Sequence, residues 1–168
     1  TKKNKILTSP ISFVSTANAI LHNNCKPAFV DIDKFSLNIC INNLKKILNK
    51  DKNIKAILPV HLGGHASSSK EIYQACSKKK ITVIEDAAHS FGAKYKDGSM
   101  IGSCKYSDLT VFSFHPVKTI TTGEGGVITT NSKDIYKRLL RFRNHGIQKN
   151  QNFWVNKNLG FSNHIKNN

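Results

Sequence analysis

The chain has 168 residues, of which 39% are hydrophobic, which is enough for one domain with a buried core and argues against disorder. No apolar run approaches the roughly 20 residues that a membrane-spanning helix needs, and no signal peptide is recognisable. We therefore expect a cytoplasmic protein with no membrane partner.

The formal net charge of +16 is a feature of many proteins that bind nucleic acids or anionic membranes. The lysines, however, are scattered in pairs and in one short run, 78–80, without interleaved aromatic residues. Because nucleic-acid binding needs a contiguous basic patch, we expect no nucleic-acid partner, and a non-catalytic basic binding protein is the less favoured alternative. The positive charge would still attract an anionic nucleotide sugar.

The four cysteines contain no Cys-x-x-Cys pair, so we expect no zinc site and no other metal site. In the absence of a secretory signal, reduced thiols that serve as small packing residues are the expected state. The cysteines are Cys25, Cys40, Cys76 and Cys104.

The first half of the chain alternates predicted strands and helices. Strands are expected at 6–10, 27–33 and 54–62, and helices at 11–21, 41–50 and 67–79. The apolar run of the second strand is typical of a strand that is buried on both faces. Ser15 or Thr16 is expected to cap the first helix, and the serines that open the third helix are expected to cap that one.

The second half continues the alternation. Strands are expected at 81–86, 108–114 and 125–131, a hairpin turn around Asp97 and Gly98, and a helix at 132–142 with Ile135, Leu139 and Leu140 facing inward. Strands and helices at this spacing predict a doubly wound, largely parallel α/β sheet.

Two of these strands deliver polar clusters at their C-terminal ends, the edge where ligands bind in open α/β sheets. The first cluster is EDAAHS at 85–90, and the second is FSFHPVK at 112–118, which is followed by the turn GEGG at 123–126. A carboxylate, a hydroxyl and a lysine in this order are the functional groups that a pyridoxal phosphate enzyme needs. They would supply the pyridinium partner, a phosphate contact and the Schiff-base lysine.

Each of these residues also has an ordinary structural explanation when it is taken alone. Lys118 could be a surface lysine, Asp86 a helix cap, and Ser113 a strand serine without a special role. Glu85 must point to the opposite face of the strand from Asp86, so the two carboxylates are not an acid pair. His89 could contact the ring oxygen or the phosphate side of the cofactor, or could be a structural histidine.

The turn at 123–126 is a weak signal, because it matches neither the dinucleotide fingerprint nor the P-loop. Its glycines allow positive φ and a close approach of the backbone. Glu124 within it could orient the lysine loop, and His115 could lie in a second layer of the site.

Together, these motifs resemble the DegT/DnrJ/EryC1/StrS family of sugar-nucleotide aminotransferases, over residues 11 to about 160. The motifs that carry the resemblance are EDAAH at 85–89, FSFHPVK at 112–118 and GEGG at 123–126, supported by FVDID at 29–33, PVHLGG at 59–64 and RNHGI at 143–147. Three ordered matches of several residues each are much stronger evidence than any one of them.

The resemblance implies the large domain of a fold-type I pyridoxal phosphate enzyme, a mostly parallel sheet flanked by helices, in incomplete form. Residues 1–147 would be part of the cofactor-binding large domain, and 148–168 a divergent tail leading toward a small domain that is absent. The family's N-terminal phosphate-binding turn is also absent, so we expect the chain to be a fragment of a longer enzyme. Family members are homodimers with shared active sites, and the dimerisation of this fragment stays an open question.

The resemblance also assigns roles to individual residues. Lys118 would be the Schiff-base lysine and proton shuttle, and Asp86 would pair with the pyridinium nitrogen. His89 would lie beside the ring oxygen, Ser113 would contact the phosphate, and Phe13 and Ala88 would sandwich the ring. From the residues alone, plain core packing is the favoured explanation for Phe13.

The implied reaction transfers an amino group from L-glutamate to a UDP-4-keto-6-deoxy-N-acetyl sugar, as in the branch of the family that serves pseudaminic acid biosynthesis. The related dehydratase branch replaces the lysine with histidine, and Lys118 argues against it. An inactive, truncated remnant of such an enzyme is the main alternative.

Overall fold

A computed structural model describes residues 4–147 of the chain. The chain divides into two compact units between Asn131 and Ser132. The second unit contains one described helix, α4 (Lys133–Arg143). It is capped by Ser132, whose hydroxyl accepts a hydrogen bond from the backbone N–H of Ile135. None of the residues of α4 is buried. Within the described part of the chain, no helix is both long enough and apolar enough to cross a bilayer.

The first unit is built on a six-stranded sheet with the order β2-β1-β3-β4-β5-β6. Strands β1 to β5 are parallel, and β6 runs antiparallel to β5, which confirms the largely parallel sheet. The strands are β1 (Lys5–Thr8), β2 (Lys26–Phe29), β3 (Ile54–Leu58), β4 (Thr82–Asp86), β5 (Leu109–Ser113) and β6 (Gly126–Thr129). The helices are α1 (Val14–His22), α2 (Ile41–Lys50), α3 (Ser69–Ser77) and a short 3-10 turn, η1 (Leu62–Gly64).

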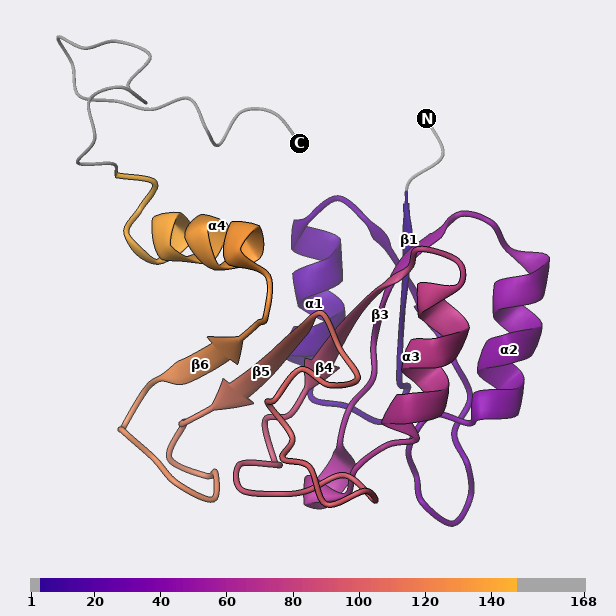
Figure 1. Cartoon of the computed structure of the whole chain (residues 1–168), viewed down its shortest axis with the longest axis horizontal. Helices are drawn as coiled ribbons and strands as arrows, with labels where there is room; N and C mark the ends of the chain where they lie inside the picture. Colours follow the sequence, from indigo (N-terminus) through magenta and orange to yellow (C-terminus); the bar gives the residue numbers. More distant parts are fainter. Residues whose placement is uncertain (1–3, 148–168) are drawn as a thin grey trace, which may run out of the picture. The chain divides into compact units, whose positions relative to one another are not determined.

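The helices cover the two faces of the sheet unequally. Helix α1 connects β1 to β2, which lies next to β1 in one direction along the sheet. Helix α2 then connects β2 to β3 on the other side of β1, and α3 connects β3 to β4 further in that direction. Because such crossovers are right-handed, the reversal places α1 on one face and α2 and α3 together on the opposite face, as Figure 1 shows. The main core lies on the α2 and α3 side and includes Leu7, Leu44, Ile57, Ile72 and Val83.

Strand β4 is the interior strand that presents polar groups to both sides. Val83 and Glu85 are buried, whereas Ile84 and Asp86 are half-buried and line a cavity on the other side. The alternation of side chains along a strand therefore separates the two carboxylates, as predicted.

The prediction that strand 27–33 is buried on both faces is wrong. This segment contributes to β2, which is shorter and lies at the edge of the sheet, where among the described strands it pairs with β1 alone. Phe29 is 53% exposed, and Pro27, which has no N–H to donate, is tolerated because an edge strand needs fewer ladder hydrogen bonds. An apolar composition alone does not distinguish an edge strand from a central one.

The predicted helix caps are wrong as well. Helix α1 begins at Val14 with Phe13 at the cap position, and α3 begins after Ser68, and neither helix has a side-chain cap hydrogen bond. Thr16 lies inside α1, where its hydroxyl bonds to a side chain 70 residues away. Within α1, Ile20 is buried, whereas the neighbouring Leu21 is 54% exposed.

Helix α2 has the predicted bounds, and the turn around Asp97 and Gly98 is confirmed by the antiparallel bridge between Lys94 and Met100. The cysteine prediction also agrees with the structure at Cys76, whose side chain belongs to the main core. Burial raises the pKa of its thiol to about 12, so it stays protonated.

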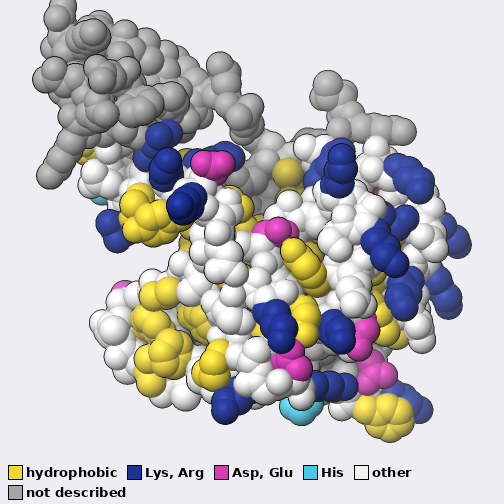
Figure 2. Space-filling view, in the orientation of Figure 1, with side chains coloured by type: hydrophobic (Ala, Val, Ile, Leu, Met, Phe, Trp, Pro, Cys, Tyr) yellow, Lys and Arg dark blue, Asp and Glu magenta, His cyan; other side chains and the backbone are white. Residues whose placement is uncertain are grey.

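On the face shown in Figure 2, the basic residues are interspersed with other side chains. On the face shown in Figure 2, Lys and Arg side chains are spread over α2, α3 and nearby loops, with acidic side chains among them. Among residues 4–147, Lys5 pairs with Asp51 and Lys105 with Asp97, each at 2.5 Å.

Candidate active site

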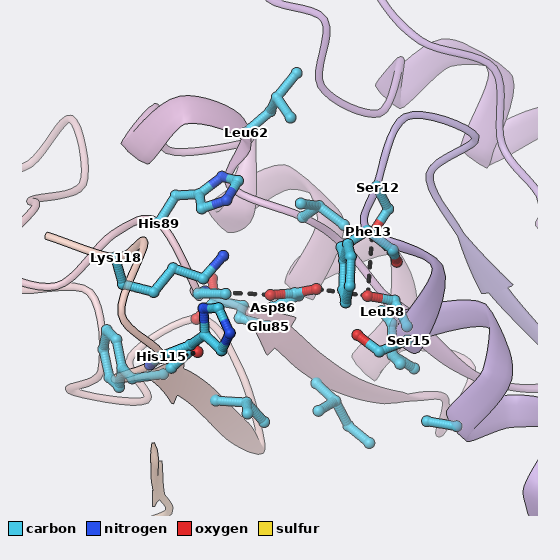
Figure 3. A pocket seen from close by; sticks show the side chains of 18 of the residues that line it. Ser12, Phe13, Ser15, Leu58, Leu62, Glu85, Asp86, His89, His115 and Lys118 are labelled. Carbon is cyan, nitrogen blue, oxygen red and sulfur yellow. Dashed lines mark hydrogen bonds between the residues drawn. The ribbon is translucent and has the colours of Figure 1, made fainter. Parts of the chain in front are cut away.

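A cavity of about 550 Å³ opens at the C-terminal ends of β3, β4 and β5, beside the first turns of α1 (Figure 3). This is the edge of the sheet at which the sequence predicted the site, and the volume lies in the range of small-molecule sites. All six predicted site residues line it, namely Phe13, Asp86, Ala88, His89, Ser113 and Lys118. Its wall includes apolar side chains of the sheet, Leu58, Val60, Ile84 and Val111.

The carboxylate of Asp86 is anchored through both of its oxygens. Oδ2 accepts a hydrogen bond from Thr16 Oγ1 at 2.7 Å, and Oδ1 accepts one from the backbone N–H of Ala88 at 3.2 Å. The backbone of Asp86 is bonded to the segment that follows β3, because its N–H donates to the carbonyl of Pro59 and its carbonyl accepts from the N–H of His61. The result is a fixed carboxylate at the end of a rigid strand.

Lys118 lies on a turn that His115 organises. The backbone N–H of Lys118 donates to the His115 carbonyl at 2.9 Å, and the N–H of Val117 donates to His115 Nδ1 at 3.4 Å. In Figure 3 the Lys118 side chain extends between His89 and His115 toward Asp86. His115 Nε2 lies 3.8 Å from Glu124 Oε1, which connects the glycine turn to the lysine turn.

His89 and Ser113 each use one polar atom within the protein and keep another available. His89 Nδ1 accepts a hydrogen bond from the N–H of Gly63 at 3.3 Å, so a neutral ring carries its proton on Nε2. Ser113 Oγ accepts from the N–H of His115 at 3.3 Å, and its own proton has no partner among the described residues. Both residues can therefore donate a hydrogen bond into the cavity.

Glu85 lies behind this site and is fully buried. Its Oε2 accepts hydrogen bonds from Tyr95 Oη at 2.6 Å and from Thr110 Oγ1 at 3.0 Å, and its Oε1 lies 3.2 Å from His61 Nε2 without hydrogen-bond alignment. His61 Nδ1 accepts from the N–H of Ser67, so the proton of a neutral ring lies on Nε2 and faces the carboxylate. Burial raises the pKa of Glu85, but the adjacent His61 and the Tyr95 hydroxyl outweigh it and keep the pKa below its ordinary value.

The glycine turn has the two properties that the sequence suggested. Gly123 has a φ of +79°, in the left-handed region that favours glycine. Gly126 pairs with Ser113 across the β5–β6 ladder, and a Cβ at Gly126 would lie only 2.7 Å from the carbonyl oxygen of Phe112.

We expect Gly126→Ala to destabilise the protein by about 1–3 kcal/mol, because the backbone of β5 must shift to admit the methyl group. The measurement is the free energy of unfolding from urea titration. Val127→Thr is the matched control, because Val127 is the adjacent and exposed residue, and this variant should stay within about 0.5 kcal/mol of the wild type. Equal stability of the two variants would contradict the close approach.

Thr16, a possible helix cap in the sequence, instead lines the cavity and bonds to Asp86. The sequence around Thr16 does not indicate this bond, because Asp86 is 70 residues away along the chain. His61 and Tyr95, which surround Glu85, carried no local signal. No group of three or more His, Cys, Asp or Glu side chains able to hold a metal ion occurs within residues 4–147.

Known proteins resemble this chain over most of its length. The UDP-4-amino-4,6-dideoxy-N-acetyl-beta-L-altrosamine transaminase of Campylobacter jejuni subsp. jejuni serotype O:23/36 (strain 81-176) is 40% identical over 149 residues, which are 88% of this chain and 39% of that protein. The GDP-perosamine synthase of Escherichia coli O157:H7 is 36% identical over 151 residues, 89% of this chain and 40% of that protein. The chain thus spans about two fifths of the length of these relatives.

Solved structures agree with the sequence comparison. Helicobacter pylori PseC, an aminotransferase involved in the biosynthesis of pseudoaminic acid, has a TM-score of 0.81 and 34% identity, covering 89% of this chain and 38% of that one. A sugar aminotransferase from Streptococcus pneumoniae, solved in its PLP form, has a TM-score of 0.78 and 26% identity, covering 88% of this chain and 42% of that one. A model described as the DegT/DnrJ/EryC1/StrS aminotransferase family matches residues 1–168, and the chain therefore belongs to this family.

Proposed function

We propose that this chain carries the pyridoxal phosphate site of a sugar-nucleotide aminotransferase. The observation that carries the proposal is the single cavity that joins the Lys118 amine, the anchored Asp86 carboxylate and the hydroxyl of Ser113. A nucleophilic amine, a fixed anion for a ring nitrogen and a hydroxyl for a phosphate are the groups that this cofactor requires. Membership of an aminotransferase family supports the same assignment.

The residues present fit the cofactor. The apolar wall formed by Val60, Ile84 and Val111 suits a flat aromatic ring. The Asp86 carboxylate has two neutral hydrogen-bond donors and no cationic partner among the described residues, so its charge is available to a protonated pyridine nitrogen. Phe13 lines the same cavity and is 72% exposed, so its ring is not a core side chain and can serve as one side of a sandwich.

When bound, pyridoxal phosphate supplies an electron sink that stabilises negative charge at the carbon next to the amino group. Asp86 would hold the proton on the ring nitrogen, His89 would donate from Nε2 to the ring oxygen, and Ser113 would donate to the phosphate. The amine of Lys118 would take a proton from the Cα of the amino donor. It would return a proton to C4 of the sugar in the second half of the reaction.

As substrates we propose L-glutamate and a UDP-4-keto-6-deoxy-N-acetyl sugar, with 2-oxoglutarate and a 4-amino sugar as products. The named activity of the Campylobacter relative supports this choice. The Escherichia relative is named for a GDP-linked sugar, so the experiment below compares UDP-linked and GDP-linked substrates. A homodimer is the proposed assembly, because the exposed side chains of Phe13 and Val117 line the cavity where a second subunit could cover them.

The test is a half-reaction on the purified chain. After incubation with pyridoxal phosphate and gel filtration, L-glutamate should yield up to one equivalent of 2-oxoglutarate per bound cofactor, and D-glutamate should yield none. A UDP-4-keto-6-deoxy-N-acetyl sugar should then allow further 2-oxoglutarate to form, and a GDP-linked keto sugar should not. Uptake of the cofactor without any 2-oxoglutarate would identify the chain as an inactive remnant, and no uptake would contradict the assigned site.

A further inference from the structure

A chain of hydroxyl groups leads from the start of α1 to the carboxylate of Asp86. Ser12 Oγ lies 3.0 Å from Thr16 Oγ1, which lies 2.7 Å from Asp86 Oδ2. An ionised carboxylate only accepts hydrogen bonds, so Thr16 donates its one hydroxyl proton to Asp86. Toward Ser12, Thr16 can therefore only accept, and the Ser12 hydroxyl has a second acceptor in the carbonyl oxygen of Phe13 at 3.2 Å.

The Thr16 hydroxyl is in a position to orient this carboxylate firmly. Thr16 is 7% exposed and lies within a helix, where its branched side chain has few rotamers. Shielding from water strengthens a hydrogen bond to a charged group. The second bond, from the N–H of Ala88 to Oδ1, holds the other oxygen, so the plane of the carboxylate is set from two sides.

We propose that Thr16 is a positioning residue, which holds the Asp86 carboxylate in the orientation that meets the pyridine nitrogen of the cofactor. The proposal rests on the proposed function for its second part, the contact with the cofactor. Its first part, the orientation of the carboxylate, concerns only the protein and can be tested without any cofactor. Thr16 touches neither reacting atom in this scheme and acts through Asp86.

The first measurement uses the cofactor-free chain. The ¹³Cγ resonance of Asp86, which reports the hydrogen bonding of its carboxylate, should shift in Thr16→Val, which replaces the hydroxyl with a methyl group of similar size. Thr16→Ser keeps the hydroxyl and should restore the resonance toward the wild-type position. Thr82→Val is the matched control, because Thr82 lies on the same strand as Asp86, is half-buried, and has no side-chain hydrogen bond within the described part of the chain.

The second measurement is the dissociation constant of pyridoxal phosphate, together with the pH dependence of the absorbance of the bound cofactor. Thr16→Val should weaken binding roughly tenfold, the equivalent of one lost hydrogen bond to a charged group. It should also shift the pH midpoint of the absorbance change, because the ring nitrogen loses a well-oriented anion. Thr16→Ser and Thr82→Val should bind like the wild type.

The outcomes separate the two proposals. An unchanged Asp86 resonance in Thr16→Val overturns the positioning role. If the Asp86 resonance shifts in Thr16→Val but the cofactor affinity and the pH midpoint do not change, the proposed effect of Thr16 on cofactor binding is wrong. If the wild-type chain takes up no cofactor while the resonance still responds to Thr16, the orientation of Asp86 by Thr16 stands and the proposed function fails.

Discussion

Replacing Lys118 with alanine should abolish covalent attachment of pyridoxal phosphate and lower any transamination rate by at least about a thousandfold. The variant loses both the amine that forms the Schiff base and the group that moves the proton. The turn should survive the change, because it is held by the backbone of Lys118 and by the ring of His115. The measurement is borohydride reduction of the loaded chain, followed by mass spectrometry of the peptide that contains Lys118.

The matched control is Lys96→Ala, because Lys96 is an exposed lysine outside the cavity. This variant should be labelled at Lys118 to the same extent as the wild type. Because the chain contains many lysines, the peptide that carries the label decides the result. Labelling spread over several surface lysines, and unchanged in Lys118→Ala, would exclude Lys118 as the site of attachment.

Glu85→Gln should lower the free energy of unfolding by roughly 3 kcal/mol near neutral pH. The buried carboxylate accepts from two hydroxyl groups and faces the Nε2 of His61, so an amide in its place directs its own N–H groups at one or more of these donors. The matched control is Glu71→Gln, which removes an exposed carboxylate from the first turn of α3 and should cost at most about 1 kcal/mol. Urea titration measures both.

The stability difference between the wild type and Glu85→Gln should also depend on pH. The pKa of Glu85 in the folded chain lies below its ordinary value of 4.5, so its ionised form contributes stability above that pH and loses the contribution as the pH falls. The stability difference between wild type and Glu85→Gln should therefore be constant at neutral pH and shrink as the pH falls from about 5 toward 3. A difference that stays constant over this range would show that the pKa of Glu85 is the same in the folded and the unfolded chain, and a difference that grows as the pH falls would show that the folded chain holds Glu85 protonated.

The location of the site follows from patterns that are local in the sequence. Asp86 and Lys118 each come shortly after an apolar strand, and parallel strands bring their C-terminal ends to one edge of a sheet. The strict alternation of a strand also separates Glu85 from Asp86 without any knowledge of the fold. For these reasons Asp86, His89, Ser113 and Lys118 could be expected around one cavity, whereas Phe13 and Ala88 were assigned to it only through the family resemblance. The roles assigned to them remain predictions.

Other features depend on contacts between segments that are far apart in the chain. Strand β2 has an apolar sequence, but its place outside β1 makes it an edge strand, and the order of strands is a property of the whole sheet. Thr16 is a plausible helix cap in the sequence, and it bonds to Asp86 only because α1 packs beside the end of β4. The partners of Glu85 come from three other segments, at His61, Tyr95 and Thr110. Periodicity and turn chemistry specify the elements and the face on which each side chain lies, whereas packing between distant segments determines which polar groups meet.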